Sequence, residues 1–301
     1  GHSSGAAASV SREDRISGRT PRESTAFARL TSKRTFSVED FKALQHDSTA
    51  WKAEQLVPLL RGVRGDSTVE RARQLPINWD RNLSKDSGAA TLYVLWEQKL
   101  EGELAAGKVP EPMASDYTDY TDYTGRTGQL LVPKYLSPDA EWFGPSSSAA
   151  RDKALAAALA AAVNDLTKKA SEDSNKWGWG TIYSATFRHV LGGDAELQQR
   201  LNVGPFPRAG CGNTPFATGG RGFEQNNGAS NREILDVADW DRSMATSAPG
   251  QSGQPGSPHF DDLAKLWVAQ TYFSLSFRES AVKANAEATL TLTPAQVTQR
   301  Q

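Results

Sequence analysis

The chain has 301 residues, of which 38% are hydrophobic and 23% are charged, and its formal net charge at neutral pH is −1. These values are typical of a soluble globular protein with a large core, and the balanced charge argues against binding to nucleic acid or to anionic membranes. No apolar run approaches the roughly 18 residues that a membrane-spanning helix needs. The start, Gly1 to Ala8, lacks the charged and apolar regions of a signal peptide and is interpreted as a tag remnant, a linker or a cut end.

Residues 1–35 are rich in Ser, Arg, Gly and Thr. They are predicted to form a solvated lead segment, in which Gly18 and Pro21 break a short helix that begins near Ser11. The first clear helix start follows at Ser37, with Asp40 three residues later near the position of a capping box. Further apolar residues at helical spacing extend this helical region to Gly62.

A second long helix is predicted from Asp86-Ser87 to Gly107, and Trp79 before it is interpreted as a core residue. Residues 110–145 are predicted to be a mobile, low-complexity insertion, because Asp116 to Thr124 is a three-residue repeat poor in core-forming residues. Its row of Asp residues suggests calcium, but the central Gly and closing Glu of an EF-hand are absent. An alanine-rich helix then follows from Ser146 to Lys169.

After Lys176 the pattern changes to strands and loops. Arg232 to Ala248 is predicted to be a β-hairpin, and Ser257 is predicted to cap a helix with Pro258 in its first position. Ala288 to Thr293 alternates with period two and is predicted to be a strand. The fold class is therefore α+β, with a lead segment at 1–35, a helical portion at 36–176 and a sheet-contributing portion at 177–301.

Few residues in the sequence are candidates for catalysis or for metal or phosphate binding. Cys211 is the single cysteine, which excludes an intrachain disulfide and a cysteine-ligated metal site. Its glycine neighbours leave open a role as nucleophile, but no histidine lies close in sequence, and an ordinary loop residue is the preferred interpretation. The glycines near 210–212 and 219–222 do not precede the Lys-Ser or Lys-Thr of a phosphate-binding loop. The histidines lack a metal-binding spacing, and no cofactor is predicted; they are His2, His46, His189 and His259.

The segment Pro249 to Asp262 resembles a segment near the C-terminus of the penicillin acylase family, a branch of the N-terminal-nucleophile hydrolases. Four further pieces resemble the same family in the same order, over roughly residues 12 to 294. They are Phe36 to Asp47 with Leu56 to Leu60, Trp79-Asp80 with Asp86 to Tyr93, Trp177 to Gly180 with Thr186 to His189, and Pro207 to Asn213.

The resemblance implies a four-layer αββα sandwich and a precursor that cuts itself into two chains. The new N-terminal Ser of the large chain is then both nucleophile and, through its α-amino group, general base, while an Asn side chain and backbone N–H groups hold the oxyanion. The implied substrates are amides with an apolar acyl group, namely β-lactams, acyl-homoserine lactones or lipopeptides. The resemblance also implies a periplasmic or secreted location, and a structural calcium in some members whose ligands cannot be identified in this sequence.

This chain departs from the family pattern at its start. Gly1 is not a nucleophile, no Ser-Asn-x-Trp start occurs, and Gly1 to Val10 does not match the segment that carries the oxyanion Asn. The expectation is therefore the C-terminal portion of the large subunit, with the remaining N-terminal segment or the small subunit as partner. Arg15, in Asp14-Arg15-Ile16, resembles an arginine that supports the substrate carboxylate or the oxyanion Asn; the alternative is a surface arginine.

Gly250 to Gly253 and His259 are interpreted as structural. A second hypothesis for the whole chain is a non-catalytic binding module that keeps the fold without the nucleophile.

Overall fold

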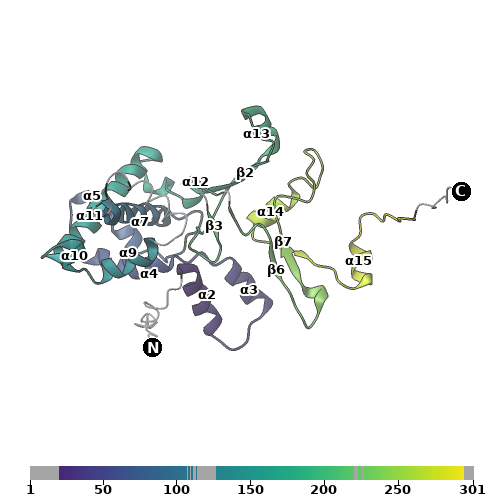
Figure 1. The fold of residues 1–301 in the computed structure, drawn as a ribbon, viewed down its shortest axis with the longest axis horizontal. Helices are drawn as coiled ribbons and strands as arrows, with labels where there is room; N and C mark the ends of the chain where they lie inside the picture. The colour runs from purple at the N-terminus through teal and green to yellow at the C-terminus, as the bar shows by residue number, and fades with distance from the viewer. Residues whose placement is uncertain are drawn as a thin grey trace. The chain divides into compact units, whose positions relative to one another are not determined.

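The computed structural model describes residues 20–106, 108, 110, 113, 127–219, 223–225 and 227–294. The chain divides into two compact units, unit 1 at Gly1–Ala229 and unit 2 at Ser230–Gln301 (Figure 1). This division lies at Ala229, whereas the sequence suggested a change of structure at 176.

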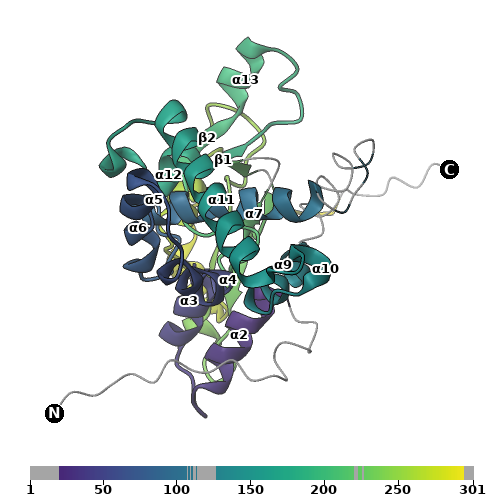
Figure 2. The ribbon, with the colours of Figure 1, turned by 90° about the vertical axis from the view of Figure 1, so that its left-hand side faces the viewer.

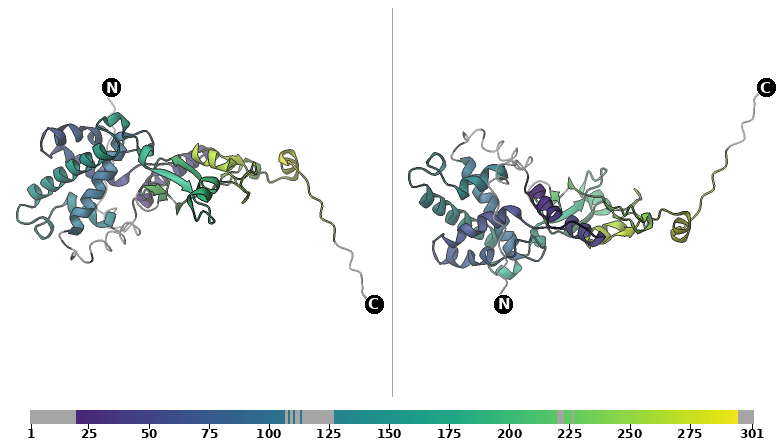
Figure 3. Two further views of the ribbon diagram at one scale, coloured as in Figure 1. Left: turned by 90° about the horizontal axis from the view of Figure 1, so that it is seen from above. Right: turned by 90° about the horizontal axis from the view of Figure 1, so that it is seen from below.

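Unit 1 is mainly helical. Its helices are α2 (Pro21–Thr31), α3 (Val38–Gln45), α4 (Trp51–Leu56), η1 (Val57–Arg61), α5 (Ser67–Ala72), α6 (Gln74–Ile77), α7 (Gly88–Ala106), α9 (Thr127–Leu136), α10 (Ala140–Phe143), α11 (Ser147–Lys169), η2 (Ser174–Lys176), α12 (Trp179–Ile182) and α13 (Ala195–Leu201). Most of the helices from α4 to α11 gather into one group, coloured blue to teal in Figure 3.

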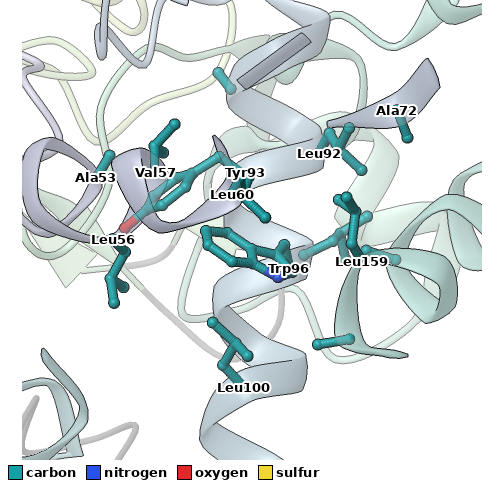
Figure 4. Packing of buried hydrophobic residues seen from close by; sticks show 14 of the residues in the cluster. Ala53, Leu56, Val57, Leu60, Ala72, Leu92, Tyr93, Trp96, Leu100 and Leu159 are labelled. Carbon is teal, nitrogen blue, oxygen red and sulfur yellow. The ribbon is translucent and has the colours of Figure 1, made fainter. Parts of the chain in front are cut away.

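The central helix of unit 1 is α7, whose residues from Ala90 to Trp96 are mostly buried. Ser87 Oγ accepts a hydrogen bond from Ala90 N at 3.1 Å and starts the helix where the sequence predicted. Trp96 is completely buried between α7 and α11, and its Nε1 donates to the Leu155 carbonyl at 3.1 Å. Figure 4 shows Trp96 between Leu60 of η1 and Leu159 of α11, and Figure 2 shows α11 crossing α7. Each such buried side chain contributes about 1.5–3 kcal/mol through the hydrophobic effect.

Within the predicted lead segment, residues 21–31 form helix α2, of which only Pro21 and Thr25 are buried. Thr20 and Glu23 make a complete capping box, and Pro21 stands at the first helical position. A proline there needs no hydrogen-bond partner and has a suitable φ, so Pro21 stands at the start of α2, while the helix expected near Ser11 lies outside the described residues. The capping box of α3 is also complete, with Ser37 and Asp40 in the predicted roles.

The predicted insertion at 110–145 is wrong over its second half. Residues 127–136 form α9, which contains Pro133, and residues 140–143 form α10. Tyr135 is buried, and its hydroxyl donates to the Leu100 carbonyl of α7 at 3.3 Å. Contact with the core thus holds a helix that its proline disfavours. The Asp-Tyr-Thr repeat lies outside the described residues.

The strands of unit 1 are short and form two small sheets. Strand β1 (Ser184–Phe187) pairs antiparallel with β2 (Val203–Pro207) and parallel with β4 (Glu224–Gln225). Strand β3 (Thr218–Gly219) pairs antiparallel with β5 (Asn227–Gly228). Helix α13 lies in the connection between β1 and β2, at the end far from the helical group (Figures 1 and 2). Unit 1 is therefore a mixed helix and sheet structure.

Unit 2 contains one three-stranded antiparallel sheet in the order β6-β7-β8. Its elements are β6 (Arg232–Ile234), η3 (Trp240–Arg242), β7 (Met244–Thr246), α14 (Asp262–Val268), β8 (Phe273–Ser274) and α15 (Glu279–Asn285). The predicted hairpin is confirmed, with shorter strands than expected. Its small core holds the apolar side chains of Ile234, Ala245, Ala264 and Trp267.

Two predictions for unit 2 are wrong. The helix begins at Asp262 and not at Ser257, because the Ser257 hydroxyl accepts a hydrogen bond from His259 N at 3.2 Å within a turn. Ala288 to Thr293 forms no strand, and Leu290 and Leu292 are more than 80% exposed. A period-two pattern makes a strand only where a neighbouring strand pairs with it, and none does in the described part of unit 2.

Candidate functional site

Arg15, the one site residue that the resemblance offered, lies outside the described residues. The described parts of four matched pieces do meet in unit 1. They come together where residues 46–50, 79–85, 177–183 and 207–218 contact one another, and we call this place the motif junction.

Backbone hydrogen bonds join the first two segments of the motif junction, residues 46–50 and 79–85. Leu83 N donates to the Ser48 carbonyl at 3.0 Å, and Ala50 N donates to the Arg81 carbonyl at 2.8 Å. The Ser48 hydroxyl also bonds to Asn82 Oδ1 at 2.7 Å. Arg81 has a positive φ of 67°, and its guanidinium donates to the Pro76 carbonyl at the end of α6. The Trp-Asp turn is thus fixed on both sides.

The loop at 207–218 is attached to all three other segments. Gly210 N donates to the Leu83 carbonyl at 2.8 Å, Phe216 N to the Asp47 carbonyl at 2.9 Å, and the indole of Trp179 to the Gly210 carbonyl at 2.9 Å. These bonds satisfy backbone groups that would otherwise be buried without partners.

Gly180 lets the segments approach closely. A Cβ atom at this position would lie 2.8 Å from Pro207 Cβ and 2.9 Å from Lys85 Cβ. The Gly180 amide donates to the Lys85 carbonyl at 2.6 Å, which requires the same close approach. The Trp-Gly-Trp-Gly pattern therefore serves packing at this point.

Aromatic rings fill the motif junction. Trp179 stacks on Tyr183 with centroids 4.3 Å apart, and the Tyr183 hydroxyl donates to the Thr218 carbonyl. The guanidinium of Arg208, which is almost completely buried, lies 4.0 Å from the centroid of Phe216. Burial raises the pKa of Tyr183 well above its ordinary value, so its hydroxyl stays a neutral donor.

Cys211 lies within this loop and is partly buried. Burial raises the pKa of its thiol to about 11, even though Asn213 N donates to the sulfur at 3.4 Å. At neutral pH almost all of this thiol is protonated, and a protonated thiol is a poor nucleophile. The geometry favours the ordinary loop residue over the nucleophile.

A buried ionic cluster, which the sequence reasoning missed, lies beside the motif junction. Lys52 of α4 contacts Glu97 of α7 and lies 3.4 Å from Glu101 of the same helix, and the three side chains are 6%, 14% and 18% exposed. Burial alone would lower the pKa of Lys52, but the two carboxylates outweigh it and raise that pKa. The sequence pattern that could have predicted this cluster is the spacing of Glu97 and Glu101, which puts two carboxylates on one face of a helix.

The segment that first resembled the family lies in unit 2, and its contacts are with its own neighbours. Ser252 N donates to the His259 carbonyl at 2.9 Å, and Ala264 N donates to the Pro249 carbonyl at 2.7 Å. His259 pairs with Asp262 at 2.9 Å and with Glu287 at 3.4 Å. The hydrogen bond from Asp262, and then the charges of both carboxylates, raise the pKa of His259.

No group of three or more His, Cys, Asp and Glu side chains among the described residues is placed to hold a metal ion. None of the described helices is long and apolar enough to cross a membrane.

Comparison with known proteins gives one family. The profile of the penicillin amidase family matches residues 4–284. A penicillin acylase 2 proenzyme from a Pseudomonas species is 28% identical over 276 residues, which are 89% of this chain and 34% of that protein. An acyl-homoserine lactone acylase QuiP from Pseudomonas fluorescens is 23% identical over 297 residues, which are 91% of this chain and 36% of that protein. The chain thus spans about a third of the length of these relatives.

The fold agrees with this family. A solved structure of a thermostable penicillin G acylase from Alcaligenes faecalis matches with a TM-score of 0.55 at 18% identity, and the match covers 90% of this chain and 52% of that chain. The family profile covers nearly the whole chain, including the five pieces that resemble the family in the sequence. The chain belongs to the penicillin amidase family.

Proposed function

We propose that this chain is the C-terminal portion of the large subunit of an acylase that hydrolyses the amide bond between an apolar acyl group and an amine. The observation that carries the proposal is the family match over residues 4–284, together with relatives of which this chain spans about a third. The rest of the enzyme, as an N-terminal segment or a small subunit, is the proposed partner. It supplies the Ser nucleophile and completes the αββα sandwich.

In this mechanism the partner's N-terminal Ser attacks the amide carbon, and its own α-amine takes the hydroxyl proton. The C–N bond then breaks, the amine leaves with that proton, and water hydrolyses the ester of the acyl-enzyme to release the carboxylic acid and restore the Ser hydroxyl. Arg15 is proposed to hold the substrate carboxylate or the oxyanion Asn, because a guanidinium presents two parallel donors to such groups. The described residues of this chain act as the scaffold, and the motif junction keeps α2, α4, α7 and the 207–218 loop in fixed positions.

The substrate class is proposed from the relatives. One is named a penicillin acylase and others are named acyl-homoserine lactone acylases, so the two acyl groups to compare first are phenylacetyl and a long aliphatic chain. A lipopeptide is a third candidate. Because of the same resemblance we propose a periplasmic or secreted location, which cell fractionation tests.

The experiment measures hydrolysis of phenylacetyl and long-chain acyl chromogenic amides, first by this chain alone and then by the chain with the Ser-led partner segment co-expressed. Activity only with the partner is the expected result, and the preferred acyl group then gives the substrate. Activity of the chain alone would contradict the expectation that this chain lacks the nucleophile. A stable complex that is inactive on every substrate would favour the binding module.

A further inference from the structure

One segment of unit 1 is folded although unit 1 does not bury it. Residues 188–202 connect β1 to β2 and contain α13, and we call them the tip segment. None of its residues is buried, and α13 lies away from the helical group (Figures 1 and 2). A helix of only 7 residues is not stable in water by itself. The apolar packing of unit 1 therefore does not explain why the tip segment is ordered.

Hydrogen bonds within the tip segment give it a defined shape. His189 N donates to Asn202 Oδ1 at 2.9 Å, which joins the two ends of the segment. Gly192 N donates to the His189 carbonyl at 3.0 Å, and the Gln198 side chain donates to the Gly192 carbonyl at 3.2 Å. These bonds close a turn and attach it to α13. A turn that is fixed in this way loses little conformational entropy when it binds a partner.

The turn presents two neighbouring aliphatic side chains to solvent. Val190 is 94% exposed and Leu191 is 66% exposed, and we call these two residues the tip pair. Single exposed apolar side chains are common on protein surfaces, whereas adjacent ones on a fixed turn are typical of a contact surface. The tip pair is therefore a candidate docking surface.

The tip pair has a firm support in unit 1. Strand β1 directly follows Tyr183 of the motif junction, and β2 ends at Pro207, where the loop of the motif junction begins. Arg208 N donates to the Tyr183 carbonyl at 3.0 Å and so joins the two chain segments at the base of the strands. The profile of the family covers the whole region, residues 4–284. The tip segment is thus an extension of the part of unit 1 in which the matched pieces meet.

The comparisons favour the rest of the enzyme as the occupant of this surface. This chain spans 34% of the penicillin acylase 2 proenzyme, and it matches the fold of 52% of the solved acylase chain. About half of that solved chain therefore lies outside the match and packs against the matched part. A permanent interface of this kind resembles a domain core cut in half, with apolar side chains at its centre.

We propose that the tip pair is a docking site for the remaining portion of the acylase, and that Val190 and Leu191 enter an apolar pocket of that portion. This inference rests on the proposed function. Transfer of the two side chains from water into the pocket favours association, and the preformed turn reduces the entropy that opposes it.

The test measures the association of this chain with the co-expressed Ser-led portion, for the wild type and for Val190→Ser/Leu191→Ser. Because both side chains are exposed in the free chain, the substitutions leave its fold intact. The matched control is Leu290→Ser/Leu292→Ser, which changes side chains that are 82% and 83% exposed after α15. Size-exclusion chromatography over a dilution series gives the dissociation constant, and hydrogen exchange follows residues 188–202 before and after assembly.

The expected result is about a hundredfold weaker association for the tip variant, because burial of each aliphatic side chain contributes about tenfold or more. The control associates as the wild type does. The amides of residues 188–202 exchange more slowly in the assembled wild-type enzyme than in the free chain, since docking suppresses their opening.

Equal association of the tip variant and the wild type would overturn the inference, and so would an equal loss in the control. A dimer of the wild-type chain that the tip variant dissociates would assign the surface to a second copy and would also overturn it, as would a wild-type chain that forms no complex with the Ser-led portion. A complex that the tip variant weakens but that hydrolyses no amide would instead overturn the proposed function and leave the docking site standing.

Discussion

Replacement of Lys52 by Met is the sharpest test of how unit 1 is held together. Lys52 is the cation shared by Glu97 and Glu101, and it joins α4 to α7 beside the motif junction. Methionine has a similar length and fills the same space, but it leaves two carboxylates four residues apart without their cation. The variant therefore removes the charge with little change in packing.

The expected loss of stability follows from the burial of the three groups. Two unit charges 3.4 Å apart, the separation of Lys52 and Glu101, attract by about 5 kcal/mol at an effective dielectric constant of 20. Removal of one partner of a buried pair costs about 3–5 kcal/mol. Because both glutamates keep some exposure to solvent, we expect the lower end, about 3 kcal/mol.

The assay is urea unfolding followed by tryptophan fluorescence. The rings of Trp79 and Trp96 both contact Tyr93 of α7, the helix that carries the two glutamates. With a slope of about 3 kcal/mol per molar urea, the midpoint should fall by about 1 M. A triple variant that also carries Glu97→Gln and Glu101→Gln should recover much of the loss. A loss below 1 kcal/mol in the single variant, or no recovery in the triple variant, would refute this account of the cluster.

The pH dependence of the cluster follows from the raised pKa of Lys52. A folded-state pKa above the unfolded value, about 10.4 for Lys, contributes stability that is fully present below that value and is lost as pH rises through the folded pKa. The wild type should therefore lose stability more steeply than Lys52→Met above about pH 10, and equal slopes would contradict the assignment.

Three further changes test other parts of the molecule. Gly180→Ala should destabilise unit 1 by about 1–3 kcal/mol through overpacking. The control Gly102→Ala, where nothing lies within 4 Å of the added Cβ, should not destabilise it, and the midpoints of urea unfolding of the two variants measure the difference. Burial raises the pKa of the Cys211 thiol to about 11, so it should react with iodoacetamide at pH 7 about tenfold more slowly than an ordinary thiol, because the higher nucleophilicity of a more basic thiolate offsets part of its lower abundance; equal rates would contradict the raised pKa. The pKa of His259, followed by NMR, should lie above 6.5 and fall in Asp262→Asn; its ion pairs add stability below pH 6.5 that is lost as pH rises through the raised pKa.

Local signals in the sequence predicted local structure well. Ser37 and Ser87 start helices as expected, because a hydroxyl before an apolar run satisfies free backbone N–H groups wherever the helix then packs. Trp79 is a core residue as expected. The family was also recognised from short motifs, since their glycines and tryptophans fill positions where close approach admits few other residues.

The failures came where tertiary contacts decide the outcome. The Asp-Tyr-Thr repeat suggested an insertion over 110–145, but Tyr135 contacts α7, and α9 is helical despite its internal proline. The alternation around Leu290 and Leu292 suggested a strand, but pairing depends on a neighbour that no local pattern reveals. Lys52 was not noticed because its partners lie 45 and 49 residues away in sequence.

The core of unit 2 bears on how long the protein survives in a cell. In the described residues 230–294, four apolar side chains are buried, while Leu235, Val237, Trp240 and Phe277 are exposed. So small a core gives a low free energy of local opening, and proteases cut a chain where it opens most often. Any molecule that binds the closed form of unit 2 lowers the open population by mass action. The rate at which a protease cuts residues 230–294 thus reports how often unit 2 opens, and a ligand of the closed form would slow that cutting.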